Sequence, residues 1–229
     1  KSLKYDFAVQ RGKPADVLPF WVADMDFEIP SELKQVLLDR VNHGIFGYTE
    51  SDDEYFNVLK QWFASRFNWN IDKKWLVKTP GVVFALAMAV RAFTKKGEGV
   101  LINQPVYYPF SMVIDDNDRN LINVPLIQGE DRYTIDFEGV ERAIIEHNVT
   151  LFLLCNPHNP VGRVWTEEEL KHLGDICIKH NVIIISDEIH ADFVWDGHKH
   201  TVFANLGESY AEHCIVCTAP SKSFNIAGL

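Results

Sequence analysis

The chain is short of cysteine, of long apolar runs and of basic residues, and each shortage excludes a class of protein. Four cysteines in 229 residues are too few and too scattered for a disulfide scaffold, so we expect a reducing compartment, the cytoplasm. No apolar stretch approaches the ~20 residues that a transmembrane helix needs, and the first residues do not resemble a signal peptide. A net charge of -10 disfavours nucleic acid and anionic membranes as partners.

The sequence also lacks the usual signatures of nucleotide and metal sites. It contains no G-x-G-x-x-G and no G-x-x-x-x-G-K pattern, so neither a dinucleotide nor a nucleoside triphosphate is expected. His190, His198 and His200 are close in sequence, but no helical i, i+4 pair of ligands is present, and we expect no metal. Cys214 and Cys217 form a C-x-x-C, but they lie in a strand-like run, where residues three apart point to opposite faces. We therefore expect neither a redox pair nor a zinc site there.

From about residue 77 onward, short β-branched runs alternate with helical patterns. The expected strands cover residues 99–103, 121–125, 150–155, 182–186 and 214–218. A helix is expected after Thr166, which forms a capping-box pattern with Glu169. This alternation predicts an α/β fold with three layers, α/β/α, around a mainly parallel sheet.

Two polar features near the expected strands are candidates for binding an anion and an oxygen. Gly81, followed by Val82 and Val83, precedes a helical run and would present free backbone N–H groups to an anion. A simple helix-starting turn is the alternative. Asn156 follows a strand and opens a proline-rich loop, where its amide could bond a ligand oxygen or only form a turn.

Two charged residues also follow expected strands, at the edge where open α/β sheets bind ligands. Asp187 comes directly after an apolar run, and a buried carboxylate there needs a cationic partner. An Asp that caps the next turn is the alternative. Lys222 follows the last strand, and burial of a lysine at such a place can make it a nucleophilic amine toward an aldehyde.

Together, these groups are the parts that a protein needs to bind pyridoxal 5'-phosphate. The Gly81 turn would seat the phosphate, and Asn156 would bond the phenolate oxygen of the ring. Asp187 would pair with the ring nitrogen, and Lys222 would supply the amine that attaches the cofactor.

Three motifs in the chain resemble those of the fold type I pyridoxal-phosphate enzymes related to aspartate aminotransferase. They are Asn156-Pro157-x-Asn159-Pro160-x-Gly162, Asp187-Glu188-Ile189-His190 and Ser221-Lys222. The segments 20–27, 46–49, 105–110 and 221–225 resemble the cystathionine β-lyase branch, often called MalY/PatB-like, and the resemblance covers essentially the whole chain. It implies a carbon–sulfur β-lyase that converts cystathionine or related cysteine S-conjugates into pyruvate, ammonia and a thiol, as a homodimer with shared active sites.

The resemblance also implies individual roles around the cofactor ring. Lys222 would hold the cofactor as a Schiff base and act as general base, Asp187 would pair with the ring nitrogen, and Asn156 would bond the phenolate oxygen. His190 occupies a position where relatives often carry Tyr, which suggests a second contact to that oxygen. Tyr107 would stack on the ring.

Further residues are implied at the phosphate and at the substrate entrance. The backbone at Gly81, Val82 and Val83 would bind the phosphate, with Ser221 nearby, and Tyr48 would reach the phosphate of the neighbouring subunit. The residues implied at the substrate entrance are Trp21, Ala23 and Asp24.

The resemblance predicts how the chain is divided. Residues 1–44 would be an N-terminal segment that forms an arm and part of a small domain, and residues 45–229 a pyridoxal-phosphate-binding large domain. Relatives continue for well over a hundred residues past the lysine motif, so we expect the C-terminal small domain, with the arginine that binds the substrate carboxylate, to be absent from this chain. An aminotransferase, or a regulatory or binding protein on the same scaffold, is the alternative function.

Overall fold

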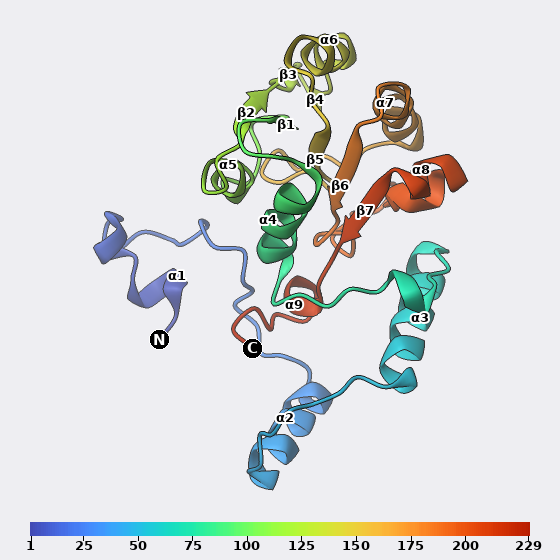
Figure 1. Cartoon of the computed structure of the whole chain (residues 1–229). Helices are drawn as coiled ribbons and strands as arrows, with labels where there is room; N and C mark the ends of the chain where they lie inside the picture. Colours follow the sequence, from blue (N-terminus) through green and yellow to red (C-terminus); the bar gives the residue numbers. More distant parts are fainter. The chain divides into compact units, whose positions relative to one another are not determined.

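The computed structural model describes residues 1–229, which divide into two compact units. The smaller unit contains residues 1–49 and 220–229, and the larger unit contains residues 50–219 (Figure 1). Each unit is described by itself. The division into an N-terminal segment and a large cofactor-binding domain stays a prediction. No helix is both long enough and apolar enough to span a membrane.

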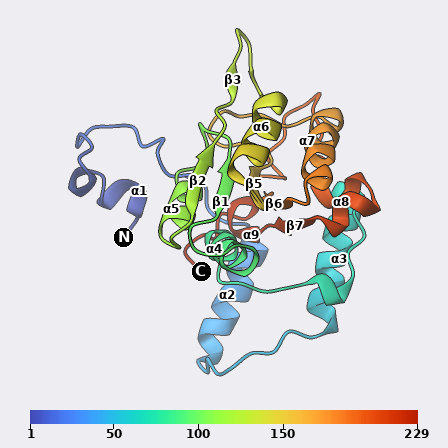
Figure 2. The same cartoon turned by 45° about the horizontal axis from the view of Figure 1, so that its top comes forward.

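The larger unit is built on a five-stranded sheet in which every neighbouring pair of strands is parallel. The strand order is β2-β1-β5-β6-β7, as Figure 2 shows. The strands are β1 (Gly99–Ile102), β2 (Asn120–Asn123), β5 (Leu151–Cys155), β6 (Ile183–Asp187) and β7 (Cys214–Cys217). All of the expected strands are therefore confirmed, with shifts of one or two residues at their ends. A separate antiparallel pair, β3 (Ile127–Gln128) and β4 (Tyr133–Thr134), was not expected.

Helices cover both faces of this sheet, which confirms the three-layer α/β/α prediction. Helices α4 (Val82–Phe93) and α5 (Pro109–Asp115) pack on one face, and α6 (Phe137–His147) and α7 (Glu167–Lys179) on the other (Figure 1). The remaining helices of the unit are α3 (Asp53–Phe67), α8 (Glu208–Glu212) and the short 3-10 helices η2 (Lys73–Trp75) and η3 (Phe203–Leu206).

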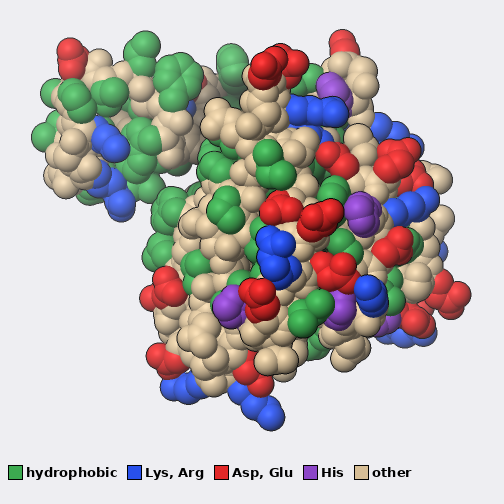
Figure 3. All heavy atoms as spheres, turned by 90° about the horizontal axis from the view of Figure 1, so that it is seen from above, with side chains coloured by type: hydrophobic (Ala, Val, Ile, Leu, Met, Phe, Trp, Pro, Cys, Tyr) green, Lys and Arg blue, Asp and Glu red, His purple; other side chains and the backbone are tan.

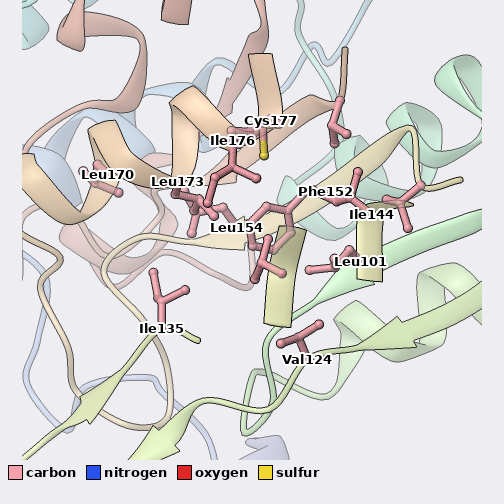
Figure 4. Close-up of a cluster of buried hydrophobic side chains, with 14 of the residues drawn as sticks. Leu101, Val124, Ile135, Ile144, Phe152, Leu154, Leu170, Leu173, Ile176 and Cys177 are labelled. Atoms are coloured by element: carbon pink, nitrogen blue, oxygen red, sulfur yellow. The ribbon is translucent and has the colours of Figure 1, made fainter. Parts of the chain in front are cut away.

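The alternation of side chains along a strand explains the two apolar layers. Phe152 and Leu154 of β5 point into the layer under α6 and α7, whereas Leu151 and Leu153 point into the layer under α4 and α5. Figure 4 shows the first layer, with Leu173 of α7 packed above β5. Each fully buried Leu, Ile or Phe contributes roughly 1.5–3 kcal/mol to folding, so β5, buried along its whole length, anchors the unit.

The start of α7 is fixed by hydrogen bonds that the sequence pattern predicted. Thr166 Oγ1 accepts a bond of 3.2 Å from the backbone N–H of Glu169, and the Glu169 carboxylate accepts one of 2.8 Å from the backbone N–H of Thr166. Arg163 adds a nearly buried ion pair of 2.6 Å to the same carboxylate. Because these bonds fix the start of α7, the end of the loop between β5 and α7 is held in place.

Gly174 of α7 leaves no room for a side chain, which predicts the effect of replacing it by alanine. An added Cβ would lie 2.6 Å from a ring carbon of Tyr210 and 3.2 Å from one of Phe203. Alanine is ordinarily better than glycine in a helix by about 1 kcal/mol, but overpacking costs about 1–3 kcal/mol. We expect Gly174→Ala to lower the free energy of unfolding by up to about 2 kcal/mol in urea titrations.

The control is the same substitution in a Tyr210→Ala background, where the nearest clash is gone. There Gly174→Ala is expected to be neutral or stabilising. An equal loss of stability in both backgrounds would show that the close contact with Tyr210 is not the cause.

Charged side chains of both signs are mixed on the surface of the larger unit, as the face in Figure 3 shows. Exposed pairs include Lys171 with Glu167 at 2.6 Å and Lys179 with Glu141 at 2.7 Å. Such pairs are screened by solvent and contribute little to stability. This face therefore carries no large patch of a single sign.

The smaller unit contains the helices α1 (Leu3–Asp6), η1 (Val9–Arg11), α2 (Ser31–His43) and α9 (Pro220–Ser223). The aromatic segment 19–27 contains no helix or strand. Lys4 is buried and binds the Asp26 carboxylate at 2.9 Å and the backbone oxygen of Asp24 at 3.0 Å. These bonds hold α1 to the segment 24–26.

Candidate functional site

The carboxyl ends of β5 and β6 place two of the expected site residues side by side. Asp187 is the last residue of β6 and Asn156 follows β5 directly. The backbone N–H of Asn156 donates to the backbone oxygen of Asp187 at 2.9 Å. Because parallel strands end at one edge of the sheet, the sequence placed both residues there correctly.

Asp187 is a buried carboxylate without a cation from the larger unit. Its side chain is in register with Cys155 on β5 and with Cys217 on β7, and the residue is 6% exposed. One carboxylate oxygen accepts a bond of 3.2 Å from the backbone N–H of Ile189, and no Lys, Arg or His of the unit pairs with it. Burial raises the pKa of Asp187 to about 7, since desolvation disfavours the charged form. Such a carboxylate suits a cationic ligand atom.

The raised pKa predicts how the stability of the unliganded protein depends on pH. Unfolded Asp187 titrates near its ordinary value of 3.8, and the folded carboxyl near about 7. The folded state thus holds the proton more tightly, and this contribution to stability is complete below pH 4 and is lost as the pH rises through 7. In urea titrations, the stability of wild type relative to Asp187→Asn is expected to fall by about 4 kcal/mol between pH 4 and pH 8. A constant difference over this range would contradict the burial of an unpaired carboxyl.

Asn156 carries a buried amide with an uncommitted oxygen. The residue is fully buried, and its Nδ2 donates to the backbone oxygen of Thr201 at 3.1 Å. Its Oδ1 is buried and has no hydrogen-bond partner. An unsatisfied buried polar atom costs about 1–3 kcal/mol, which a ligand that donates to Oδ1 would recover. Nδ2 carries a second N–H besides the one that binds Thr201.

The proline-rich loop after Asn156 is held by a histidine that the sequence analysis did not single out. His158 is buried, and its Nε2 lies 2.9 Å from the backbone oxygen of Pro105. Desolvation lowers the pKa of His158 to about 4, so the ring is neutral at pH 7 and Nε2–H donates to that carbonyl. His158 thereby ties the loop after β5 to the loop after β1.

The amino end of α4 is a second polar feature of the larger unit. Gly81 is the N-cap residue, with a φ of 112° that favours glycine, and it provides no side-chain cap. The first N–H groups of the helix, at Val82 and Val83, are therefore available to an anion, which the helix dipole favours. Val82 packs in the same apolar layer as Cys155 and Cys217, the two residues in register with Asp187.

Two further expected residues lie in loops of the larger unit. Tyr107 is 37% exposed, and its ring centroid lies 5.2 Å from that of Tyr108. Desolvation raises the pKa of Tyr107, with added contributions from Tyr108 and from the negative charge of Asp187. His190 is half-buried, with its ring edge-on to Phe193 at 6.2 Å. The Asp187 carboxylate is thus close enough to influence Tyr107.

In the smaller unit, hydrogen bonds connect the Lys222 segment to the expected substrate entrance. Lys222 Nζ donates to the backbone oxygen of Ala23 at 3.1 Å. The Asn225 side chain accepts from the Met25 N–H at 3.0 Å and donates to the Met25 oxygen at 3.1 Å. Asn225 also donates to the backbone oxygen of Phe27. The structure therefore brings Lys222 and Ala23 together, with Asn225 fixing the two segments.

The other expected residues of the smaller unit differ in their surroundings. Trp21 Nε1 and Asp24 Oδ1 are buried without a hydrogen-bond partner. Ser221 is half-buried in α9, next to Lys222 in sequence. Tyr48 is fully exposed. No group of three or more His, Cys, Asp or Glu side chains in the chain is arranged to hold a metal ion.

The larger unit is therefore an α/β protein with a buried carboxylate and a buried amide at the carboxyl ends of β5 and β6, and with no side-chain cap at the amino end of α4. The chain belongs to the aminotransferase class I and II family, whose model matches residues 15–229.

Individual relatives and solved structures are similar to the chain. The chain is 45% identical over 229 residues to cystathionine beta-lyase PatB of Bacillus subtilis (strain 168), covering 100% of this chain and 59% of that protein. Cystalysin of Treponema denticola, whose crystal structure contains pyridoxal 5'-phosphate, is 43% identical with a TM-score of 0.93, over 99% of this chain and 58% of that one. The pyridoxal-phosphate-bound C-S lyase of Staphylococcus hominis is 35% identical with a TM-score of 0.91, over 100% of this chain and 58% of that one. The chain thus spans less than two thirds of the length of these relatives.

Proposed function

We propose that the protein is a pyridoxal-phosphate-dependent carbon–sulfur β-lyase that acts on cystathionine or related cysteine S-conjugates. The observation that carries the proposal is the buried Asp187 carboxylate, which has no cation of its own unit beside it. The names of the relatives, a cystathionine beta-lyase and a C-S lyase, support this reaction class.

The polar groups at the sheet edge fit the parts of pyridoxal 5'-phosphate. The protonated ring nitrogen would supply the cation that Asp187 lacks, and the ring oxygen would bond the Asn156 amide, whose second N–H is uncommitted. The N–H groups at Val82 and Val83, after Gly81, would bind the phosphate. These are the three kinds of partner that the cofactor needs from a protein.

The remaining residues would complete the site. Lys222 would attach the cofactor through its amine, and it follows Cys217, the register partner of Asp187, by only five residues. Tyr107 would stack on the ring, and His190 would make the second contact to the ring oxygen. Ser221 would bind near the phosphate.

When bound, the cofactor would supply an electron-withdrawing ring that makes loss of the Cα proton of an amino-acid substrate possible. Asp187 would keep the ring nitrogen protonated by holding a negative charge beside it. Lys222, when its amine is not attached to the cofactor, would take the Cα proton as general base. With one water consumed, the products would be a thiol, homocysteine in the case of cystathionine, together with pyruvate and ammonia.

The surroundings of this site follow from the same proposal. Trp21, Ala23 and Asp24 would line the substrate entrance, since Lys222 already binds the backbone of Ala23. The exposed Tyr48 would contact the phosphate of a second subunit, so the protein would act as a homodimer with shared sites. All four cysteines are free, which supports a cytoplasmic location.

A product assay tests the reaction. The intact protein with pyridoxal 5'-phosphate and L-cystathionine is expected to form pyruvate and a free thiol in equal amounts without a keto acid. Transamination is the second candidate, because the matching family model is named for aminotransferases. Turnover that requires a keto-acid acceptor would favour it and contradict the lyase.

A further inference from the structure

Glu188, the residue after Asp187, is a fully buried carboxylate held by three donors. Its Oε1 accepts from the Ser186 hydroxyl at 2.8 Å and from the backbone N–H of Phe203 at 2.9 Å, and its Oε2 lies 2.8 Å from His200 Nε2. Glu188 and His200 are 2% and 4% exposed. Because the carboxylate oxygen accepts, His200 Nε2 must carry the hydrogen of that bond.

These bonds fix the segment 200–203 on both sides of Thr201. His200 and Phe203 are attached to Glu188, and Phe203 is also buried in the apolar layer under α7. The His200 and Phe67 rings are nearly perpendicular, at a centroid distance of 5.5 Å. The backbone of Thr201 lies between these attachments and has little freedom to move.

The backbone oxygen of Thr201 selects the orientation of the Asn156 amide. A carbonyl only accepts hydrogen bonds, so it binds Nδ2 of Asn156 and not Oδ1. The opposite orientation would place two acceptor oxygens against each other in a buried space, where repulsion is strong. The position of Thr201 therefore decides which amide atoms remain for a ligand.

We propose that Glu188 and His200 are positioning residues that hold Thr201 so that its carbonyl fixes the Asn156 side-chain amide for ligand binding. Neither residue needs to touch the ligand. Only the identification of that ligand as pyridoxal 5'-phosphate rests on the proposed function.

The first test uses the intact protein without cofactor and measures solvent exchange of the Asn156 side-chain N–H groups by NMR with ¹⁵N-labelled asparagine. The signals are assigned by their loss in Asn156→Asp. We expect His200→Leu to speed the exchange about tenfold, the factor for one hydrogen bond of ordinary strength. His200→Gln retains a donor for Glu188 and is expected to restore slow exchange.

Two matched variants keep the test decisive. His198→Leu changes an exposed histidine of the same loop and is expected to leave the exchange unchanged. His200→Phe keeps a ring beside Phe67 but removes the donor to Glu188, so it should speed the exchange as His200→Leu does, and it decides the result if His200→Leu does not fold. Unchanged exchange in both His200→Phe and a folded His200→Leu would overturn the proposal.

The second readout is the dissociation constant of pyridoxal 5'-phosphate. It is expected to rise about tenfold in His200→Leu and to return near the wild-type value in His200→Gln. A wild-type protein that does not bind the cofactor would contradict the proposed function, while the amide exchange would still decide the role of Glu188 and His200. Equal weakening by His200→Leu and His200→Gln, without a difference in amide exchange, would reduce both residues to a structural role.

Discussion

Replacing Lys222 by alanine is expected to lower the rate of pyruvate formation from L-cystathionine by at least about 10³-fold. Under the proposed function, the variant would lose both the amine that attaches the cofactor and the base that takes the Cα proton. Because Lys222 binds only the backbone oxygen of Ala23 within its own unit, its removal should change the free energy of unfolding little. Activity is measured as pyruvate release and stability by urea titration.

The control for this prediction is Lys171→Ala on the exposed face of α7, where the lysine pairs only with Glu167. It removes the same charge and is expected to retain wild-type activity. A Lys222→Ala protein that still forms pyruvate at more than about a tenth of the wild-type rate would contradict the role of Lys222 as general base. A retained biological effect without lyase activity would favour a regulatory or binding protein.

Replacing Asp187 by asparagine is expected to lower kcat/KM by about 10²–10³-fold. A neutral amide cannot hold the ring nitrogen of the cofactor in its protonated form, so charge that develops on the substrate is less stabilised. The same substitution removes a buried, unpaired carboxyl and should raise the stability of the unliganded protein at pH 8. Kinetics and urea titration of the same preparation measure both effects.

Opposite changes in activity and stability distinguish a functional carboxylate from a structural one. Asp116→Asn, at an exposed acid that follows α5, is the control and should change neither quantity. If Asp187→Asn lost stability and activity together, the carboxylate would be part of the structural framework. That result would contradict its proposed pairing with a ligand cation.

The sequence predicted the sheet edge well because its features are local. Runs such as 182–186 are β-branched and apolar, and parallel strands bring their carboxyl ends together. The positions of Asn156 and Asp187 therefore followed from the strands alone. The pair β3 and β4 was not predicted because each strand has two residues, too few to show a period.

The contacts that orient the site could not be derived from the sequence. Thr201 binds Asn156 through its backbone oxygen, 45 residues away. Because every residue type has a backbone oxygen, the amino acid at position 201 does not reveal this contact. Asn225 binds Met25 across 200 residues. Its motif indicated a relationship to other proteins, but only the structure shows which atoms it bonds.

The central claim, that the Lys222 amine binds the aldehyde of the cofactor, is tested most directly by reduction with borohydride. The intact protein is incubated with pyridoxal 5'-phosphate, reduced, digested and examined by peptide mass spectrometry. The account predicts one phosphopyridoxyl group, on the peptide that contains Lys222. A label on another lysine, or no label after saturation with the cofactor, would contradict it.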